Sequence, residues 1–300
     1  MEKKIRAAVV GYGNIGRFTL QALEAAPDFE IVGVVRRNPA AKQPLELTNH
    51  TVVDDISKLE NVDVAILCTP TRSCPDYAKA IIPQGIHTVD SFDIHARIPA
   101  YRAEMTPICK ENGRVSVIAA GWDPGSDSIV RTLLQSLAPK GLTYTNFGPG
   151  MSMGHSVAAR SKKGVRNALS MTIPVGQSIH RRMVYVELED GADIGEVTRE
   201  ITADPYFASD ETHVIAVPSV DAVRDMGHGV NLTRQGVSGQ AQNQRFAFNM
   251  EINNPALTGQ VLVNVARAAM RLEPGCYTMI EIPVVDMLPC SRDEAVAALV

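Results

Sequence analysis

The feature that most constrains the fold of this chain is a glycine pattern that directly follows its first apolar run. Residues 5 to 10, Ile-Arg-Ala-Ala-Val-Val, have the composition of a short buried strand, and Gly11-Tyr12-Gly13-Asn14-Ile15-Gly16 follows at once. An amphipathic helix containing Phe18, Leu20 and Leu23 comes next. In such a unit the first glycine permits a tight turn, the second lets the backbone approach a pyrophosphate, and the third lets the helix pack on the strand. The pattern predicts an α/β fold of the Rossmann type, a doubly wound parallel sheet with a dinucleotide site at residues 11 to 16.

The residues after the second predicted strand indicate which dinucleotide this site takes. The strand covers Phe29 to Val35 and is followed by Arg36 and Arg37, and residues 31 to 45 contain neither Asp nor Glu. An acidic side chain at this point holds the ribose 2′-hydroxyl of NAD, whereas an arginine suits the 2′-phosphate of NADP. We therefore predict NADP; the alternative is a pair of solvated loop arginines.

Three further apolar runs continue the parallel sheet, and each ends in a polar loop. Strands are predicted at 62–67, 86–89 and 115–119, with helices at about 76–82, 98–111 and 128–137. In a doubly wound sheet the loops that follow the strands lie along the ligand crevice. We expect cofactor contacts from these loops at Thr69, Pro70, Thr71, Arg72, Ser91, Phe92 and Gly121.

The loops after the last two of these strands also carry the first candidates for chemistry. Asp90, Asp93, Trp122 and Asp123 lie within reach of a substrate placed against the cofactor. A carboxylate there can hold a cationic amino group or take its proton. Each residue also has a structural reading, because Asp90 or Asp93 can form an Asx turn, Asp123 can start a helix and Trp122 can belong to the core. The residues alone leave these alternatives open.

From Tyr144 onward the pattern changes to strands with period-2 alternation. The Gly- and Met-rich segment 145–155 is expected to form a long loop, followed by strands at 168–174, 182–188, 213–217 and 245–252 and a helix at 194–203. These elements predict an α+β substrate and dimerisation domain with a mostly antiparallel sheet. A helix from Asn254, with Pro255 at its first position, to about Leu272 is expected to pack back on the first domain. We place the domain limits at 1–122, 123–253 and 254–300.

Several polar residues of the second half are candidates for binding a substrate carboxylate. Thr172, His180 and His228 are among them, and His228 lies between glycines that allow a ligand close to the backbone. Arginine binds carboxylates through paired hydrogen bonds, but Arg181 and Arg182 are adjacent and so point to opposite faces of a strand. One of the two can face a pocket, and the pattern does not tell which.

Charge and composition argue against several other functions. The 300 residues carry a net charge of −4 without a dense Lys/Arg cluster, so we expect no nucleic-acid partner. No apolar stretch approaches the roughly 18 residues of a membrane span, and the first residues run straight into a strand, so we expect no membrane partner and a cytoplasmic location. The five cysteines lack zinc spacing, so we expect no metal.

Five motifs together resemble one family, the meso-2,6-diaminopimelate dehydrogenases. They are Val-Val-Gly-Tyr-Gly-Asn-Ile-Gly-Arg at 9–17, Asp-Ser-Phe-Asp-Ile-His at 90–95, Gly-Trp-Asp-Pro-Gly at 121–125, Phe-Gly-Pro-Gly-Met-Ser-Met-Gly-His at 147–155 and Met-Gly-His-Gly at 226–229. The resemblance covers essentially the whole chain. The motifs at 121–125 and 147–155 are far more specific than the dinucleotide fingerprint at 11–16.

The resemblance implies a reversible, NADP-dependent oxidative deamination at the D-centre of meso-diaminopimelate, which yields L-2-amino-6-oxopimelate and ammonia. It implies that Asp93 and Asp123 hold the amino group that reacts. It further implies that substrate contacts come from Trp122, Phe147, Ser152, Met153, Gly154, Thr172, Arg182, His228 and Asn254. Among these, Thr172, Arg182 and His228 would bind the distal L-centre carboxylate, and Asn254 the distal amino acid end. A small-molecule substrate and a homodimer are the expected partners.

The chain departs from the family pattern at two places. The segment between Thr172 and His180 is short, and Phe147 stands where tryptophan is common. Both places border the distal pocket, so we expect some reductive amination of small 2-keto acids to D-amino acids. The competing readings are another NADP-linked reductase of amino-acid biosynthesis and a non-catalytic NADP-sensing regulator on the same fold.

Overall fold

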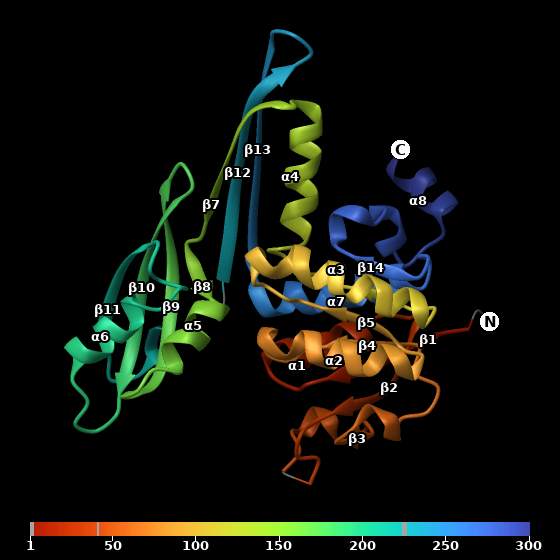
Figure 1. The fold of residues 1–300 in the computed structure, drawn as a ribbon, viewed down its shortest axis with the longest axis horizontal. Helices are drawn as coiled ribbons and strands as arrows, with labels where there is room; N and C mark the ends of the chain where they lie inside the picture. Colours follow the sequence, from red (N-terminus) through yellow and green to blue (C-terminus); the bar gives the residue numbers. More distant parts are fainter. Residues whose placement is uncertain (1–2, 41, 224–226) are drawn as a thin grey trace. The chain divides into compact units, whose positions relative to one another are not determined.

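The computed structural model describes residues 3–40, 42–223 and 227–300, and these divide into two compact units. The first unit contains residues 1–130 and 255–300, and the second contains residues 131–254. The chain therefore leaves the first unit once and returns to it near its end. Figure 1 labels the helices and strands of both units.

The first unit is built on a seven-stranded parallel sheet with the strand order β14-β6-β5-β4-β1-β2-β3. Its strands are β1 (Ile5–Val10), β2 (Phe29–Val35), β3 (Val52–Val53), β4 (Val64–Leu67), β5 (His87–Asp90), β6 (Val115–Val117) and β14 (Gly275–Tyr277). The strand order reverses between β1 and β4, and ligands of such sheets bind at the carboxyl ends of the strands beside this point. The predicted doubly wound parallel sheet is confirmed, and β14 is an edge strand that the pattern did not predict.

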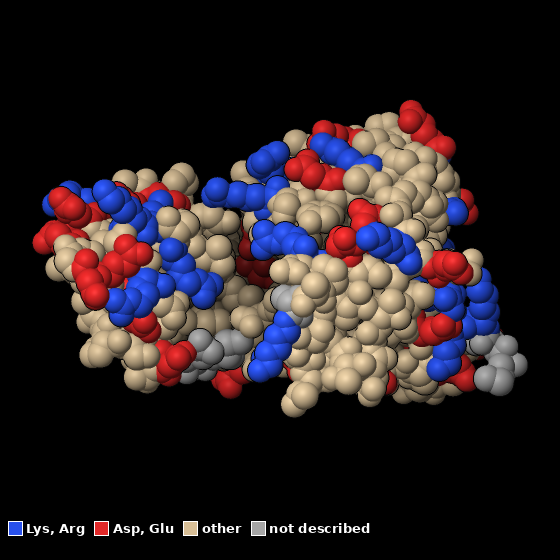
Figure 2. Space-filling model, turned by 90° about the horizontal axis from the view of Figure 1, so that it is seen from below, with Lys and Arg blue, Asp and Glu red and all other residues tan. Residues whose placement is uncertain are grey.

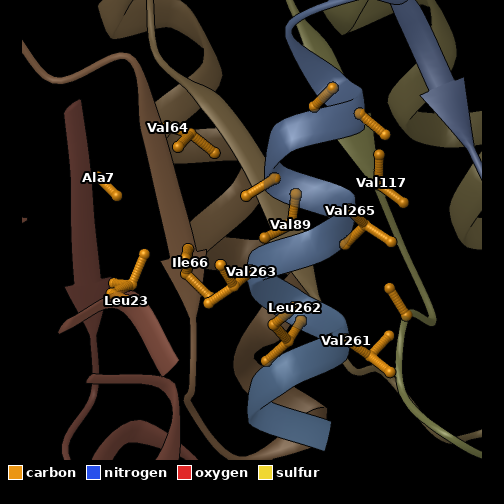
Figure 3. Close-up of a cluster of buried hydrophobic side chains, with 14 of the residues drawn as sticks. Ala7, Leu23, Val64, Ile66, Val89, Val117, Val261, Leu262, Val263 and Val265 are labelled. Carbon is orange, nitrogen blue, oxygen red and sulfur yellow. The ribbon is translucent and has the colours of Figure 1, made fainter. Parts of the chain in front are cut away.

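Helices cover both faces of this sheet. One face is packed by α1 (Asn14–Glu24) and α7 (Asn254–Ala269), and the other by α2 (Cys74–Ile81) and α3 (Ile98–Glu111). The short α8 (Arg292–Leu299) follows near the end of the chain. Figure 3 shows Val261, Leu262, Val263 and Val265 of α7 against the apolar side chains of the sheet. Burial of this dry layer stabilises the unit and anchors the loops at the carboxyl ends of its strands.

The second unit contains two smaller sheets. One has the order β11-β10-β9-β8 and the other the order β13-β12-β7, and β10 and β11 are parallel while the other pairs are antiparallel. The strands are β7 (Lys140–Phe147), β8 (Gly150–Ser152), β9 (Val165–Gly176), β10 (Ile179–Leu188), β11 (Glu211–Ala216), β12 (Gly227–Ser238) and β13 (Gln242–Asn253). The helices are the end of α4 (Ser126–Leu137), α5 (Met153–Arg160) and α6 (Ile194–Thr202). The predicted mostly antiparallel sheet is confirmed.

The predicted loop at 145–155 is wrong. The segment contains the end of β7, all of β8 and the start of α5. The strand β12, which begins at Gly227, was not predicted either. Glycines depress strand propensity, which hid both strands. In the fold they permit close approach, since a Cβ at Gly148 or Gly150 would lie 2.2 Å from the carbonyl oxygen of Thr172 or Gly227. Met226 itself lies outside the described residues.

The short segment between Thr172 and His180 is a tight hairpin. Gln177 and Ser178 join β9 to β10, with φ of 50° and 67°. Two successive residues with positive φ are typical of a two-residue β-hairpin turn. The hairpin places Thr172 directly opposite Arg182 in the register of the two strands.

Surface charge and helix length agree with the composition. Figure 2 shows lysines and arginines interspersed with aspartates and glutamates over the face in view. None of the helices in the described ranges has the length and hydrophobicity that crossing a membrane requires. Across the same ranges, no group of three or more His, Cys, Asp or Glu side chains is arranged to hold a metal ion.

Candidate active site

The glycine-rich turn of the first unit has the steric properties that a pyrophosphate site needs. Gly11 has a φ of 96°, and a Cβ there would lie 2.7 Å from the carbonyl oxygen of Cys68. A Cβ at Gly16 would lie 2.2 Å from the carbonyl oxygen of Gly11, whereas a Cβ at Gly13 would meet no described atom within 4 Å. Gly13 caps α1, whose first turn has neither a side-chain cap nor an acidic residue. Free N–H groups and open space therefore coincide at Gly13, Asn14 and Ile15, which fits a dinucleotide phosphate.

Alanine substitutions at two of these glycines are expected to separate stability from cofactor binding. Gly16→Ala brings a Cβ against backbone and is expected to lower the free energy of unfolding by about 1–3 kcal/mol. Gly13→Ala clashes with nothing inside the protein, but its methyl group occupies the space of the phosphate, so we expect Kd for NADP⁺ to rise about tenfold or more with stability changed by less than about 1 kcal/mol. Chemical denaturation and fluorescence titration measure the two effects. Unchanged NADP⁺ affinity in Gly13→Ala would contradict this placement.

Arg36 and Tyr12 form the second part of the predicted cofactor site. The Arg36 guanidinium lies 5.9 Å from the centre of the Tyr12 ring and donates a hydrogen bond to the Gln43 side chain. Burial, with Glu46 nearby, raises the pKa of the Tyr12 phenol to about 12, so it stays a neutral hydroxyl. Arg37 is exposed. Arg36 thus presents a cation at the carboxyl end of β2, where the ribose phosphate of NADP is expected.

Asp90 ties together the loops that follow β5 and β6. One of its carboxylate oxygens, Oδ1, accepts hydrogen bonds from the backbone N–H of Phe92 (2.9 Å) and of Ala119 (3.1 Å), and Oδ2 accepts one from the Tyr101 hydroxyl (2.8 Å). The residue is fully buried, and this burial raises the pKa of its carboxyl group to about 6. Asp90 therefore has a positioning role. The Phe92 side chain packs on Tyr101 in the core, which leaves only its main chain for the expected cofactor contact.

Asp93 lies beside the loop that follows β4. Its backbone N–H donates a hydrogen bond of 3.0 Å to the Thr71 hydroxyl, so the loops after β4 and β5 are joined there. The Oδ1 atom of Asp93 is buried, and among the described residues it has no hydrogen-bond partner. A buried, partnerless carboxylate oxygen is costly unless a ligand satisfies it. A cationic or hydrogen-bond-donating ligand group would satisfy this oxygen.

Asp123 belongs to a tight loop after β6. A Cβ at Gly125 would lie 1.9 Å from the carbonyl oxygen of Gly121, so only glycine fits where this loop closes on itself. Trp122 is 6% exposed, and the Oδ2 atom of Asp123 lies 3.9 Å from Nε2 of His95. The loop that follows β6 thus supplies a carboxylate and a large aromatic ring. Of the remaining cofactor candidates, Thr69, Pro70 and Arg72 lie in or beside the short turn before α2, and Ser91 follows Asp90.

The second unit resolves the choice between the two adjacent arginines. Arg182 donates from Nε to the Asp210 carboxylate (2.6 Å) and from Nη1 to the Thr172 hydroxyl. Its side chain is 13% exposed, whereas that of Arg181, paired with Glu211, is 42% exposed. The two arginines lie on opposite faces of β10, and Arg182 is on the sheltered face together with Thr172.

His180 and His228 lie close enough to Arg182 to be affected by its charge, and Phe147 packs against His180. Nε2 of His180 accepts a 2.8 Å hydrogen bond from the backbone N–H of Phe147, and the two rings are 5.5 Å apart. His228 is 7% exposed, and its Nδ1 accepts a bond from the backbone N–H of Gly229. Burial lowers the pKa of His228 to about 4, and the positive charge of Arg182 contributes to this. At neutral pH this histidine is uncharged, so Arg182 supplies the positive charge.

Ser152 is the last residue of β8 and the N-cap of α5, and Met153 and Gly154 lie in the first turn of this helix. The Ser152 hydroxyl lies 2.7 Å from Nδ1 of His155, whose ring packs edge-on against Tyr206 and Phe207. Burial lowers the pKa of His155 to about 4, and Arg182 again adds to the effect. Asn254 is buried at the start of α7. The expected substrate residues of the second unit are therefore concentrated on β8, β9, β10 and the strand ends beside them.

Known proteins match the chain over nearly its whole length. A meso-diaminopimelate D-dehydrogenase of Bacteroides fragilis is 66% identical over 298 residues, covering 99% of this chain and 100% of the relative. The chain belongs to the meso-diaminopimelate D-dehydrogenase family. A meso-diaminopimelate D-dehydrogenase from Lysinibacillus sphaericus is 36% identical over 93% of this chain and 94% of the relative. The model of the diaminopimelic acid dehydrogenase C-terminal domain matches residues 121–181, and that of the NAD-binding Rossmann fold of an oxidoreductase family matches residues 5–89.

Solved structures of the family superpose along the whole chain. The Corynebacterium glutamicum diaminopimelate dehydrogenase in complex with diaminopimelate has a TM-score of 0.90 at 29% identity, covering 99% of this chain and 100% of that chain. An engineered D-amino acid dehydrogenase bound to NADP⁺ has a TM-score of 0.89 at 28% identity with the same coverage. The diaminopimelate dehydrogenase fold is therefore shared by this chain.

The buried histidines of this family member are expected to make it sensitive to acid. Burial lowers the pKa of His87, of His155 and of His228 to about 4 in the folded state, against an ordinary value near 6.5. Between pH 6.5 and about 4 these histidines are protonated in the unfolded state but neutral in the folded state. The free energy of unfolding therefore falls as the pH is lowered through this range. Asp90 acts in the opposite sense, since its raised pKa favours the protonated folded form below pH 6. We expect the free energy of unfolding to be about 3–4 kcal/mol lower at pH 5 than at pH 7.

Urea denaturation at pH 7, 6 and 5 measures this difference. A free energy of unfolding that stays constant or rises toward pH 5 would contradict it.

Three functional partners escaped the sequence reasoning. Asp210 is hydrogen-bonded to Arg182, Tyr101 to Asp90, and His155 to Ser152. His155 stands in a motif that was singled out, so its closeness to Ser152 had a signal at a spacing of three residues. Asp210 is 28 residues from Arg182 and had none, because the parallel pairing of β10 with β11 brings it there.

Proposed function

We propose that this chain catalyses the reversible, NADP-dependent oxidative deamination of the D-centre of meso-diaminopimelate to L-2-amino-6-oxopimelate and ammonia. It is an oxidoreductase of the diaminopimelate dehydrogenase family. The observation that carries the assignment to the site is the buried Oδ1 of Asp93 beside the carboxyl end of the parallel sheet, which has no hydrogen-bond partner within residues 3–40, 42–223 and 227–300. In this family it is a suitable acceptor for the amino group that leaves as ammonia.

Residues of the first unit supply the reacting end of the site in this proposal. Gly11 to Gly16 and Arg36 would hold the phosphates of NADP⁺, and the cofactor would supply the hydride acceptor for oxidation of the D-carbon. Asp93 and Asp123 hold the amino group so that the C–H bond is presented in one orientation, and Trp122 restricts water. The positions of Asp90, Thr71 and Gly125, which join the three loops, support this arrangement. Water then hydrolyses the imine that the oxidation leaves on the substrate.

Residues of the second unit bind the rest of the substrate in this proposal. Arg182, Thr172 and His228 hold the distal carboxylate, and Asn254 the distal amino acid end. Ser152, Met153 and Gly154 contact the substrate from the start of α5, where backbone N–H groups are free for an anion, and Phe147 walls the site. Supporting this assignment, Arg182 is sheltered and already joined to Thr172.

Small 2-keto acids are proposed as further substrates of the reverse reaction, reductive amination to D-amino acids. Two observations favour this. The β9–β10 hairpin is a two-residue turn, so no long loop covers the distal residues from this side, and Arg182 has a counter-ion within the chain. Ammonia-dependent oxidation of NADPH with pyruvate or phenylpyruvate at high enzyme concentration is the test, and its absence would remove this extension.

Absorbance of reduced nicotinamide at equal enzyme concentration tests the main reaction. We expect reduction with meso-diaminopimelate and NADP⁺, and little with NAD⁺ or with the LL-isomer. Reduction of NAD⁺ at an equal rate would contradict the assignment of Arg36. Binding of NADPH without turnover of any substrate would favour the regulator, and turnover of a different amino acid would favour another reductase of amino-acid biosynthesis.

A homodimer in the cytoplasm is the proposed state of the enzyme. Leu133, Leu137 and Leu142 of the second unit are 55%, 48% and 63% exposed, which is unusual for three neighbouring large apolar side chains. A symmetric dimer is the commonest way to cover such residues. Sedimentation equilibrium is expected to give twice the chain mass, and a monomer at micromolar concentration would contradict the proposal.

A further inference from the structure

Arg182, the cation proposed to bind the distal carboxylate, already has a partner of opposite charge within the chain. Its Nε atom donates to Asp210 at 2.6 Å and its Nη1 atom donates to Thr172. The two charged side chains are 13% and 18% exposed, so the pair is largely sheltered from water. Two of the three guanidinium nitrogens thereby donate within the chain, and Nη2, which has no hydrogen-bond partner among the described residues, is left for a ligand.

The segment before β11 holds Asp210 in place. Its backbone N–H donates to the carbonyl oxygen of Phe207 (3.1 Å), and its carbonyl oxygen accepts from the Thr212 hydroxyl (3.1 Å). Phe207 is itself 1% exposed and belongs to the core of the unit. The backbone of Asp210 is therefore anchored by the fold, which fixes the position from which its carboxylate reaches Arg182.

A counter-ion in this place changes which substrates the site accepts. An arginine without one would be a sheltered, uncompensated charge whenever the ligand lacks a distal carboxylate, and such a charge is unfavourable. With Asp210 present, a ligand with an uncharged distal end leaves the site electrically balanced. A ligand with a distal carboxylate binds Arg182 but is repelled by Asp210, so its advantage is reduced.

We propose that Asp210 is a specificity-determining positioning residue that neutralises Arg182 and so admits D-amino acids and 2-keto acids with uncharged side chains to the diaminopimelate site. The inference rests on the proposed function, in which Arg182 meets the distal end of the substrate. It adds to that function that the ion pair between Arg182 and Asp210 determines how wide a range of substrates the site accepts.

The adjacent pair on the opposite face provides a matched control. Arg181 and Glu211 form an ion pair of 3.0 Å, one residue along from each member of the first pair, and their side chains are 42% and 53% exposed. Glu211→Gln removes the same charge from the same stretch of chain on the face of β10 that lacks Thr172. Any general effect of losing a carboxylate there appears in this control.

Steady-state kinetics of Asp210→Asn, with meso-diaminopimelate and D-norleucine as the two substrates, tests the proposal. Asparagine retains an acceptor for Nε of Arg182 and loses the charge. We expect KM for meso-diaminopimelate to fall about threefold or more, KM for D-norleucine to rise, and the ratio of the two kcat/KM values to shift about tenfold or more toward diaminopimelate. The kcat for meso-diaminopimelate stays near that of the wild type, and Glu211→Gln shifts the ratio by less than about twofold.

Equal changes for both substrates in Asp210→Asn, or the same shift in Glu211→Gln, would overturn the proposal. The double variant Arg182→Met/Asp210→Asn removes both charges and covers the case in which the single variant does not fold. It is expected to turn over D-norleucine within about threefold of the wild type, and loss of that turnover overturns the proposal as well. Failure of the proposed function is distinguishable, because then the wild type itself would not reduce NADP⁺ with meso-diaminopimelate.

Discussion

Asp93→Asn is expected to lower kcat for the oxidation of meso-diaminopimelate by about 10²- to 10⁴-fold. Asparagine has nearly the same shape, so the hydrogen bond from the Asp93 backbone to Thr71 is kept. In the variant an amide replaces the carboxylate whose buried Oδ1 has no partner among the described residues. The amide can neither balance the charge of a cationic amino group nor accept its proton. The effect should therefore fall on the chemical step, with Kd for NADP⁺ unchanged.

The control for this variant is Asp76→Asn, an exposed carboxylate in the first turn of α2 of the same unit. We expect its kcat to stay within about twofold of the wild type, as for most surface substitutions. Single-turnover absorbance measurements separate hydride transfer from product release. Wild-type rates in Asp93→Asn would assign the amino group to Asp123 alone.

Arg182→Met is expected to lower kcat/KM for meso-diaminopimelate by about 30-fold or more, almost entirely through KM. Removing one partner of a sheltered charge-assisted hydrogen bond costs about 2–5 kcal/mol, and each 1.4 kcal/mol is a factor of ten. Methionine fills a similar volume and leaves the reacting end of the substrate untouched. With D-norleucine, which has no distal carboxylate, the loss is expected to be less than about tenfold, and the difference between the two substrates is the informative quantity.

Arg181→Met is the matched control, because Arg181 is the exposed neighbour that pairs with Glu211. It should leave both substrates within about twofold of the wild type. Equal losses on meso-diaminopimelate and D-norleucine in Arg182→Met would indicate that the arginine supports the sheet and does not bind the distal carboxylate.

The strand–turn–helix at the start of the chain could be predicted because its signals are local. The need for glycine at positions 11 and 16 arises from contacts with the loop after β4 and within the turn itself, and the fingerprint encodes both at fixed spacing. Most first-unit elements followed from apolar runs of the right length, but the short edge strand β14 did not. The glycine-rich strands β8 and β12 could not be predicted, since their stability comes from pairing with β9, β7 and β13.

By itself, the sequence determined the parallel dinucleotide-binding sheet, the mostly antiparallel second part and the family, since each rests on periodicity or on motifs of adjacent residues. Only the tertiary structure showed that three donors, from α3 and the loops after β5 and β6, converge on Asp90, whereas Oδ1 of Asp93 has no hydrogen-bond partner among the described residues. It also decided between Arg181 and Arg182, because β9 and the segment before β11 place Thr172 and Asp210 beside one of them. These choices depend on the environment of a side chain, and that environment is made by residues distant in the sequence.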